Sequence, residues 1–146
     1  MDEKDEKILK LLRENSKLTT KQIAKKILTP ITTVHVRIKK LEKESVIKKY
    51  TLELNHKKLG NNISAYILIT VDYKSLNEIK VSQHDLVRKL KQYEFVEEAA
   101  MVTGGIDIII KIRVKDVDNL DDFVTKKLRN IEGIEKTQTM VILNEI

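Results

Sequence analysis

Residues 19–44 read TTKQIAKKILTPITTVHVRIKKLEKE and decide the fold of the first half of the chain. Thr19 and Gln22 have the spacing of a capping box, in which each side chain accepts from an otherwise unbonded backbone N–H, so a short helix begins there. Thr29 and Pro30 mark the start of the next helix, because threonine is a good N-cap and proline at the first helical position loses no hydrogen bond. The segment therefore predicts two helices joined by a short turn.

The second of these helices runs to about Glu44 and has two distinct faces. Val34, Ile38 and Leu41 form a buried stripe with i, i+4, i+7 spacing, against which a preceding helix over about residues 2–14 packs. The outward face and flanks carry Thr32, Thr33, His35, Val36, Arg37, Lys39 and Lys40. Three helices with this polarity predict a helix-turn-helix, whose second helix enters the major groove of DNA. A three-helix bundle with a charged outer face is the alternative.

The charge of the chain is unevenly divided between its halves. Residues 1–60 hold 16 Lys and Arg against 8 Asp and Glu, whereas residues 61–146 hold 12 against 14. A basic block joined to a mildly acidic one is typical of a polyanion-binding unit attached to a second domain. The alternative is a solvated charged surface, which is common in proteins rich in Lys and Glu.

Composition excludes several classes of protein. The 146 residues suit one domain or two small ones at roughly 150 residues per domain. The absence of cysteine excludes disulfides, cysteine-ligated zinc and a thiol nucleophile, and the three histidines are scattered. No apolar run approaches the roughly 18 residues of a membrane span, and no catalytic set or phosphate loop is evident. We therefore expect a cytoplasmic protein that is not an enzyme and has no cofactor, no metal and no membrane partner.

The second half of the chain alternates between strands and helices. Residues 46–54 are β-prone and predict a strand, followed by a linker, so we divide the chain into a helix-turn-helix domain over 1–50, a strand and linker over 51–62, and a domain over 63–146. In the last of these we expect the order βαββαβ. This order is typical of a ferredoxin-like α+β domain, a four-stranded antiparallel sheet with both helices on one face. The expected strands are 63–73, 96–102, 108–114 and 134–146, and the expected helices are 82–93 and 118–131.

One face of such a sheet has no helix to cover it. Ile67, Ile69, Val71 and the run over 108–112 predict apolar side chains on both faces of the sheet. Since an uncovered apolar face in a soluble protein usually marks an interface, we expect the chain to dimerise through this sheet. Coverage of that face by the rest of the same chain is the alternative.

Three segments together resemble the leucine-responsive regulator/asparagine regulator (Lrp/AsnC) family of transcription factors. They are Asp2-Glu3-x-Asp5-x-x-Ile8-Leu9, Leu41-Glu42-x-Glu44-x-Val46-Ile47-Lys48-x-Tyr50-Thr51, and Thr103-Gly104-x-x-Asp107. The resemblance implies a winged-type helix-turn-helix domain and a ferredoxin-like effector domain that dimerises and often assembles into tetramers or octamers. It also implies binding to promoter DNA and a response to amino acids.

The chain departs from this family at several positions. Leu28 replaces the glycine usual in the turn between the second and third helices, so we expect that turn to use another conformation. Ile31 stands where an arginine is common, and Gly105 and Ile106 stand where an acidic and an aromatic residue are common. The connection over 75–83 is longer than usual.

The expected DNA contacts divide between bases and phosphates. Thr32, Thr33, His35 and Val36 lie near base edges, where a threonine can donate, accept or meet a thymine methyl. His35 has an alternative as a neutral residue facing solvent. Arg37, Lys39 and Lys40 reach phosphates or the rim of the bases, and Arg37 suits either guanine or the backbone. The front of the second helix contacts phosphates through Lys17, Lys21 and Lys25.

The segment 103–107 is the expected effector loop. Thr103, Gly104 and Gly105 offer backbone N–H groups to a carboxylate, and Asp107 can accept from an ammonium, which together suit an amino acid. The resemblance implies that Thr137 and Thr139 of a neighbouring subunit complete the pocket. An ordinary glycine-rich hairpin, with Asp107 bonded to its own turn, is the alternative.

These expectations favour a homo-oligomeric, sequence-specific transcriptional regulator that binds double-stranded DNA and responds to an amino acid. A dimer predicts a pseudo-palindromic site with half-sites about one helical turn (~10 bp) apart, or a multiple of it. The alternative is a sequence-tolerant nucleoid protein, which shares the charge and the oligomerisation but has no preferred site. A metabolite-binding module leaves the basic first domain unexplained.

Overall fold

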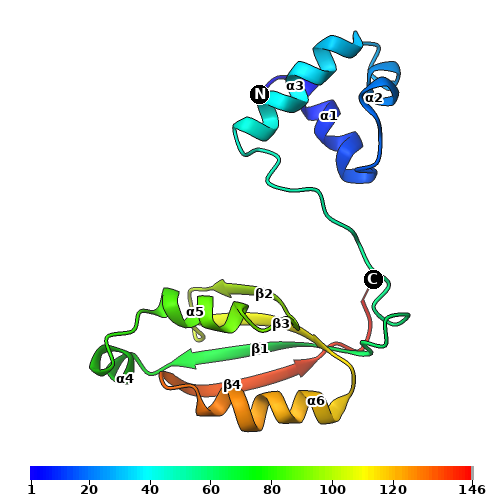
Figure 1. The fold of residues 1–146 in the computed structure, drawn as a ribbon. Helices are drawn as coiled ribbons and strands as arrows, with labels where there is room; N and C mark the ends of the chain where they lie inside the picture. Colours follow the sequence, from blue (N-terminus) through cyan, green and yellow to red (C-terminus); the bar gives the residue numbers. More distant parts are fainter. Residues whose placement is uncertain (146) are drawn as a thin grey trace. The chain divides into compact units, whose positions relative to one another are not determined.

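The computed structural model describes residues 1–145, and Ile146 lies outside the described residues. The chain forms two compact units, Met1–Leu54 and Asn55–Ile146, and the division falls within the expected linker. In the first unit, α1 (Glu3–Glu14), α2 (Thr20–Lys26) and α3 (Ile31–Lys43) form the expected helical domain (Figure 1). Its core consists of Ile8, Ile23, Ala24, Val34 and Leu41, with Ile38 partly buried beside them.

Side chains cap the beginnings of the first two helices. Asp2 caps α1 and forms a reciprocal capping box with Asp5, so the acidic start of the chain satisfies the first free N–H groups of the helix. The expected box of Thr19 and Gln22 opens α2, with Thr19 N–H donating to Gln22 Oε1 over 2.8 Å. The capping box predicted from sequence is confirmed at α2, and the box at α1 is an addition to the prediction.

The turn between α2 and α3 differs from the prediction. Helix α3 begins at Ile31 with Pro30 at the N-cap, one residue later than expected. The Thr29 hydroxyl does not cap this helix; it is buried in the turn and donates to the carbonyl of Ile27 over 3.1 Å. Leu28 adopts the left-handed conformation, with φ 49°, and its side chain is 92% exposed. The expectation of another turn conformation was therefore wrong, because the chain keeps a glycine-like turn and tolerates the strain.

The strand expected over 46–54 is absent. Residues 48–54 run without helix or strand, although Ile47 packs against the core and its N–H donates to the carbonyl of Leu41 over 3.1 Å. A strand needs a hydrogen-bonded neighbour, and residues 1–54 contain no other strand. The prediction of a strand from the β-propensity of these residues alone was therefore wrong.

The second unit has the expected four-stranded antiparallel sheet, in the order β2-β3-β1-β4. β1 (Ile63–Val71) and β3 (Ile108–Val114) are central, with β2 (Val96–Met101) and β4 (Ile134–Val141) at the edges. β4 ends five residues before the expected boundary, and the last position of that prediction, Ile146, is outside the described residues.

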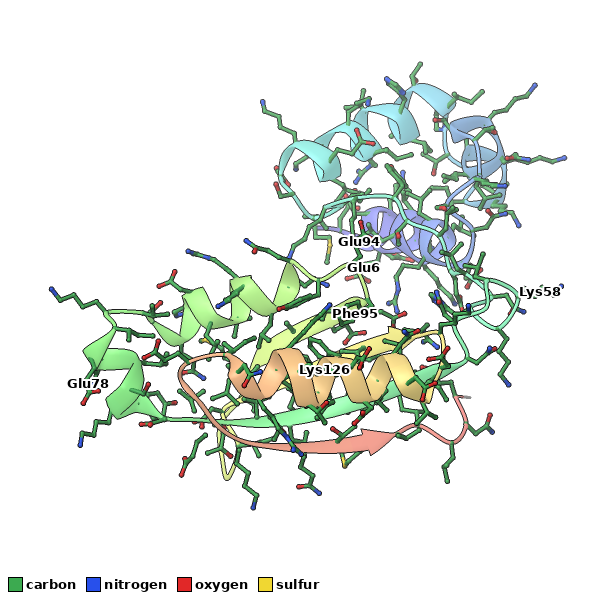
Figure 2. The ribbon with its side chains drawn as sticks, turned by 60° about the horizontal axis from the view of Figure 1, so that its bottom comes forward. Glu6, Lys58, Glu78, Glu94, Phe95 and Lys126 are labelled. Carbon is green, nitrogen blue, oxygen red and sulfur yellow. The ribbon has the colours of Figure 1, made fainter. Side chains whose placement is uncertain are left out.

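The helices of this unit contain one element that the sequence analysis missed. The connection over 75–83 contains α4 (Tyr73–Glu78), which Asp72 caps, and it precedes the expected helix α5 (Gln83–Lys91). The expected helix over 118–131 begins as α6 (Val117–Asp121) and continues as a π-helical segment and a 3₁₀ turn to Asn130. Helices α5 and α6 cover the same face of the sheet (Figure 2).

Side chains alternate between the two faces of the sheet along each strand, and this alternation decides which residues face the helices. Ile67, Ile69 and Val71 have the same parity and are buried together, and they pack with Ile108, Ile110 and Ile112 from the neighbouring strand. These residues supply only the helix-covered face, whereas Ile109 of the run over 108–112 and Leu68 lie on the other face, so the expectation of apolar side chains on both faces holds for that run and is wrong for Ile67, Ile69 and Val71. The open face is formed by the intervening residues, among them Tyr66, Leu68, Ile109, Lys111, Arg113 and Met140.

Candidate nucleic-acid interface and ligand site

Helix α3 presents one continuous exposed row. Thr32, Val36, Lys39 and Lys43 follow an i, i+4, i+7, i+11 spacing, which places them on one face opposite the buried stripe. The side chain of Val36 is 65% exposed, although it is apolar. The prediction missed Lys43. Counting the same spacing forward from Thr32 along the sequence would have identified it. The row combines a hydroxyl, a methyl-bearing side chain and two ammonium groups.

Two lysines of α3 are paired along the helix. Lys39 Nζ lies 2.9 Å from Glu42 Oε2, and Lys40 Nζ lies 3.9 Å from Glu44 Oε1. The ammonium of Lys39 lowers the pKa of Glu42, and the hydroxyl of Tyr50, which donates to Glu42 over 3.0 Å, acts in the same direction. Both lysines are well exposed, so these pairs are weak and can exchange for phosphates.

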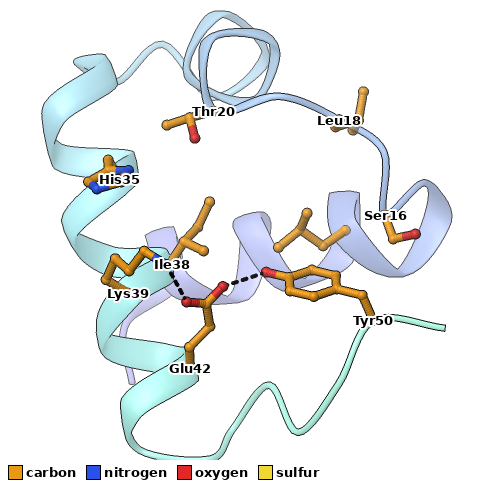
Figure 3. Close-up of a pocket in the computed structure, with 9 residues that line it drawn as sticks. Ser16, Leu18, Thr20, His35, Ile38, Lys39, Glu42 and Tyr50 are labelled. Carbon is orange, nitrogen blue, oxygen red and sulfur yellow. Dashed lines mark hydrogen bonds and ion pairs between the residues drawn. The ribbon is translucent and has the colours of Figure 1, made fainter.

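A cavity of about 340 Å³ lies beside this row (Figure 3). His35 lines it from α3, and Tyr50 faces α3 across it. The hydrogen bond from Tyr50 to Glu42 attaches residues 48–50, which have no secondary structure, to α3. This contact, and the packing of Ile47, explain how the segment after α3 is held without a strand.

Arg37 has partners that the sequence analysis did not foresee. Its Nη1 lies 2.7 Å from Asp2 Oδ2 and 2.8 Å from Asp5 Oδ1, so the guanidinium joins α3 to the beginning of α1. The hydrogen bond from Arg37 lowers the pKa of the Asp5 carboxyl. In this structure the guanidinium is engaged with two carboxylates, and it is not on the exposed row with Thr32 and Val36.

The remaining predicted DNA contacts are accessible. Lys17, Lys21 and Lys25 are exposed, and the last two lie four residues apart on α2. Within residues 1–145, none of the three takes part in an ion pair. Thr33 is half-buried on the flank of α3, beside the face that packs on the core.

In the second unit, the predicted effector loop joins the ends of β2 and β3. Thr103, Gly104 and Gly105 are exposed, and a Cβ at either glycine would meet no atom within 4 Å. Gly104 has φ +120°, a conformation that favours glycine. Among the described residues, no hydrogen bond uses the N–H groups of 103–105. Three exposed donors are therefore free for an anionic group.

Asp107 closes this loop and is held by several bonds. Its Oδ2 accepts from the N–H of Val71 over 2.8 Å, and its Oδ1 accepts from the hydroxyl of Tyr73 over 2.8 Å. Its backbone carbonyl accepts from Nε2 of Gln83 over 3.0 Å. The sequence analysis missed Tyr73 and Gln83, because they belong to α4 and to the start of α5, which lie more than twenty residues away along the chain.

Thr137 and Thr139 lie on β4 and are half-buried. Thr137 pairs with Ile69, whose carbonyl accepts from the N–H of Asp107, so the loop and Thr137 flank the same residue of β1. Thr137 also lines a cavity of about 300 Å³ together with Arg129, Ile134, Glu135 and Lys136. Arg129 is an additional cation beside Thr137 that no sequence motif indicated.

The open sheet face combines apolar and paired charged side chains. Leu68 lies opposite Ile109, and Tyr66 lies opposite Met140. Lys111 and Arg113 each form ion pairs with Glu97 and Glu145 on the same face, and the shortest, from Arg113 Nε to Glu97 Oε1, is 2.6 Å. Glu145 is the main cause of the raised pKa of Lys111. The charges are thus largely neutralised within the chain, which leaves the apolar pairs available for contact.

Neither a metal site nor a membrane span is evident in the described structure. Residues 1–145 contain no cluster of three or more His, Cys, Asp or Glu side chains that could hold a metal ion. Over the same residues, no helix is both long enough and apolar enough to cross a membrane.

Comparisons with known proteins match both units. The Lrp/AsnC ligand binding domain matches residues 64–146, and a winged helix-turn-helix DNA-binding domain matches residues 1–48. The chain is 36% identical over 143 residues to the HTH-type transcriptional regulator FL11 of Pyrococcus furiosus. The match covers 98% of this chain and 89% of that protein. The chain therefore matches that regulator over nearly its whole length.

Solved structures show the same two-unit architecture. LrpC of Bacillus subtilis is 27% identical with a TM-score of 0.83, and the match covers 100% of this chain and 96% of that one. The transcriptional regulator NMB0573 of Neisseria meningitidis, solved as a complex with L-Met, is 22% identical with a TM-score of 0.90 and coverage of 100% and 92%.

Proposed function

The chain belongs to the Lrp/AsnC family of DNA-binding transcriptional regulators, and from this premise we propose that the exposed row of α3 reads promoter DNA as part of a homodimer in the cytoplasm. Thr32 and Val36 contact base edges in the major groove, and Lys39 and Lys43 contact phosphates or the rim of the bases. Lys17, Lys21 and Lys25 neutralise phosphates where α2 crosses the backbone. The proposal assigns the chain no catalytic role.

The observation that carries this proposal is the polarity of α3. Its buried stripe fixes the helix on the domain, so the row containing Thr32, Val36 and Lys43 must face outward. Val36, in the middle of that row, is apolar and 65% exposed, so its methyl groups are available for contact. Val36 suits contact with a thymine methyl, and the hydroxyl of Thr32 suits any base edge.

Dimerisation through the open sheet face pairs two reading helices. The face offers Tyr66, Leu68, Ile109 and Met140 as an apolar surface, while Lys111 and its neighbours are already paired with carboxylates. A second copy of the chain presents the same surface, which suits a two-fold interface. Two helices related by such an axis require a pseudo-palindromic site.

We also propose that an amino acid modulates DNA binding. The unbonded N–H groups of 103–105 suit its carboxylate, Asp107 suits its ammonium, and Thr137 and Thr139 of a neighbouring subunit complete the pocket. Arg129, beside Thr137, adds a cation at the same place. The L-Met complex of NMB0573 shows that one structural relative was solved with an amino acid ligand.

The salt dependence of DNA binding by the Lys43→Ala variant tests whether the exposed row of α3 contacts DNA. With a promoter fragment and fluorescence anisotropy, we expect the slope of log K against log salt to fall by about one, because one phosphate contact is lost. Lys89→Ala is the matched control, since Lys89 is equally exposed but lies on α5 of the second unit. Equal slopes for the two variants and the parent protein would show that this row of α3 does not contact DNA.

A further inference from the structure

Every polar atom of Asp107 is already bonded within the chain. Its N–H donates to the carbonyl of Ile69 over 3.0 Å, and its carbonyl accepts from Val102 and from Gln83. Its two carboxylate oxygens accept from Val71 and from Tyr73. A ligand ammonium therefore does not meet an unbonded carboxylate here, and at either oxygen it has to displace a group of the protein or share the oxygen with it.

The two partners of the carboxylate differ in how easily they can leave. The N–H of Val71 belongs to the last residue of β1, whose side chain is 3% exposed, so it is fixed by the backbone of a central strand. The partner on the other oxygen is the side chain of Tyr73, which is 51% exposed at the first turn of α4. Rotation of one exposed side chain releases this oxygen without a change in the backbone.

We propose that Tyr73 sets the affinity of the effector site, because its hydroxyl occupies the oxygen of Asp107 that the ammonium of an amino acid has to reach. This inference rests on the proposed effector function. Tyr73 thus sets a threshold of affinity: a ligand binds when its ammonium and its remaining contacts outweigh the bond from Tyr73.

Gln83 lies beside the hydroxyl of Tyr73 and offers it a second, more distant acceptor. Its Oε1 lies 3.3 Å from the oxygen of Tyr73, while its Nε2 donates to the carbonyl of Asp107 over 3.0 Å. Gln83 is half-buried and keeps its bond to Asp107 when Tyr73 rotates away. The loop therefore stays anchored in both positions of Tyr73, and the exchange is confined to one oxygen.

The test is isothermal titration of the twenty amino acids into the full-length protein and its Tyr73→Phe variant. We expect Tyr73→Phe to bind its ligands about tenfold more tightly, which is the order of one hydrogen bond to a charged group. Tyr93→Phe is the control, because its ring packs with Phe95 and Phe123 and its hydroxyl makes no hydrogen bond within residues 1–145. The N-acetyl derivative of the best ligand lacks an ammonium and should bind no more tightly to Tyr73→Phe than to the parent protein.

The results separate the two proposals. If the parent protein binds an amino acid and Asp107→Asn abolishes that binding, but Tyr73→Phe binds equally or more weakly, the role of Tyr73 is overturned and the effector site stands. If neither the parent protein nor Tyr73→Phe binds any amino acid, both proposals are overturned.

Discussion

Gly133→Ala is expected to destabilise the second unit severely. Gly133 lies directly before β4 at φ +92°, and a Cβ there would stand 2.1 Å from Cδ2 and 2.8 Å from Cγ of Leu76. Leu76 is the buried residue of α4 and is 2% exposed, so its side chain has little room to move. The carbonyl of Gly133 also accepts from the N–H of Asp72, the N-cap of α4. The substitution therefore disturbs the contact between Gly133 and α4, the helix that carries Tyr73.

Two effects add at this position. The positive φ costs an L-residue about 1–2 kcal/mol, and the reduced freedom of the unfolded chain returns part of that. Displacing a packed leucine costs about 1–3 kcal/mol more, as in other overpacked cores. We expect a total loss of about 2–4 kcal/mol in the free energy of unfolding, which for a unit of this size lowers the melting temperature by about 10–25 °C.

Gly60→Ala is the matched control. Gly60 has φ +79°, close to that of Gly133, but a Cβ there would meet nothing within 4 Å. It should therefore show only the conformational cost of about 1 kcal/mol. Thermal unfolding followed by tyrosine fluorescence measures both variants, because three of the four tyrosines lie in this unit. Equal melting temperatures for the two variants would refute the close contact between Gly133 and Leu76.

Three further predictions concern the helical unit and the open sheet face. Leu28→Gly should stabilise the helical unit by about 0.5–1 kcal/mol, because glycine relieves the left-handed strain but adds freedom to the unfolded chain. Hydrogen exchange of the backbone amides of α2 and α3 measures this gain, and an equal gain in Leu28→Ala would show that relief of the left-handed strain is not its cause. Arg37 lowers the pKa of Asp2 and Asp5 below the ordinary 3.8, so their pairing stabilises the unit above that pH and is lost as pH falls through the lowered values. Acid unfolding followed by circular dichroism should therefore show Arg37→Met less stable than the parent protein near neutral pH, with the two converging as the pH falls through those lowered pKa values; a constant difference down to acid pH would refute the ion pairs. Met140→Glu places a charge opposite Tyr66 on the open sheet face and should yield a monomer in analytical ultracentrifugation, whereas an unchanged dimer would exclude that face as the interface.

Local rules predicted much of this fold. The capping box of Thr19 and Gln22 joins residues three positions apart, so spacing alone reveals it. The buried stripe of α3 and the order of strands and helices follow from periodicity, which reports burial directly. The exposed positions of Thr32, Val36 and Lys39 followed from the same stripe.

Contacts between distant segments account for what the prediction missed. Arg37 meets Asp5 across 32 positions, and Tyr73 meets Asp107 across 34, so neither pair has a local signal. The segment over 46–54 has β-propensity but no neighbouring strand, and propensity cannot supply one. At Leu28, the packing of α2 against α3 fixes a left-handed turn that a leucine would not choose alone.

Enrichment of genomic DNA fragments by the purified protein tests the central claim most directly. At about 0.2 M salt, purely electrostatic binding is weak, so retained and sequenced fragments report specific contacts. We predict a two-fold symmetric motif near promoters for the parent protein, and its loss in Val36→Glu, whose carboxylate would face the DNA from the exposed row of α3. Fragments retained without a motif, or a motif unchanged in Val36→Glu, would contradict sequence reading by this helix and favour a sequence-tolerant nucleoid protein.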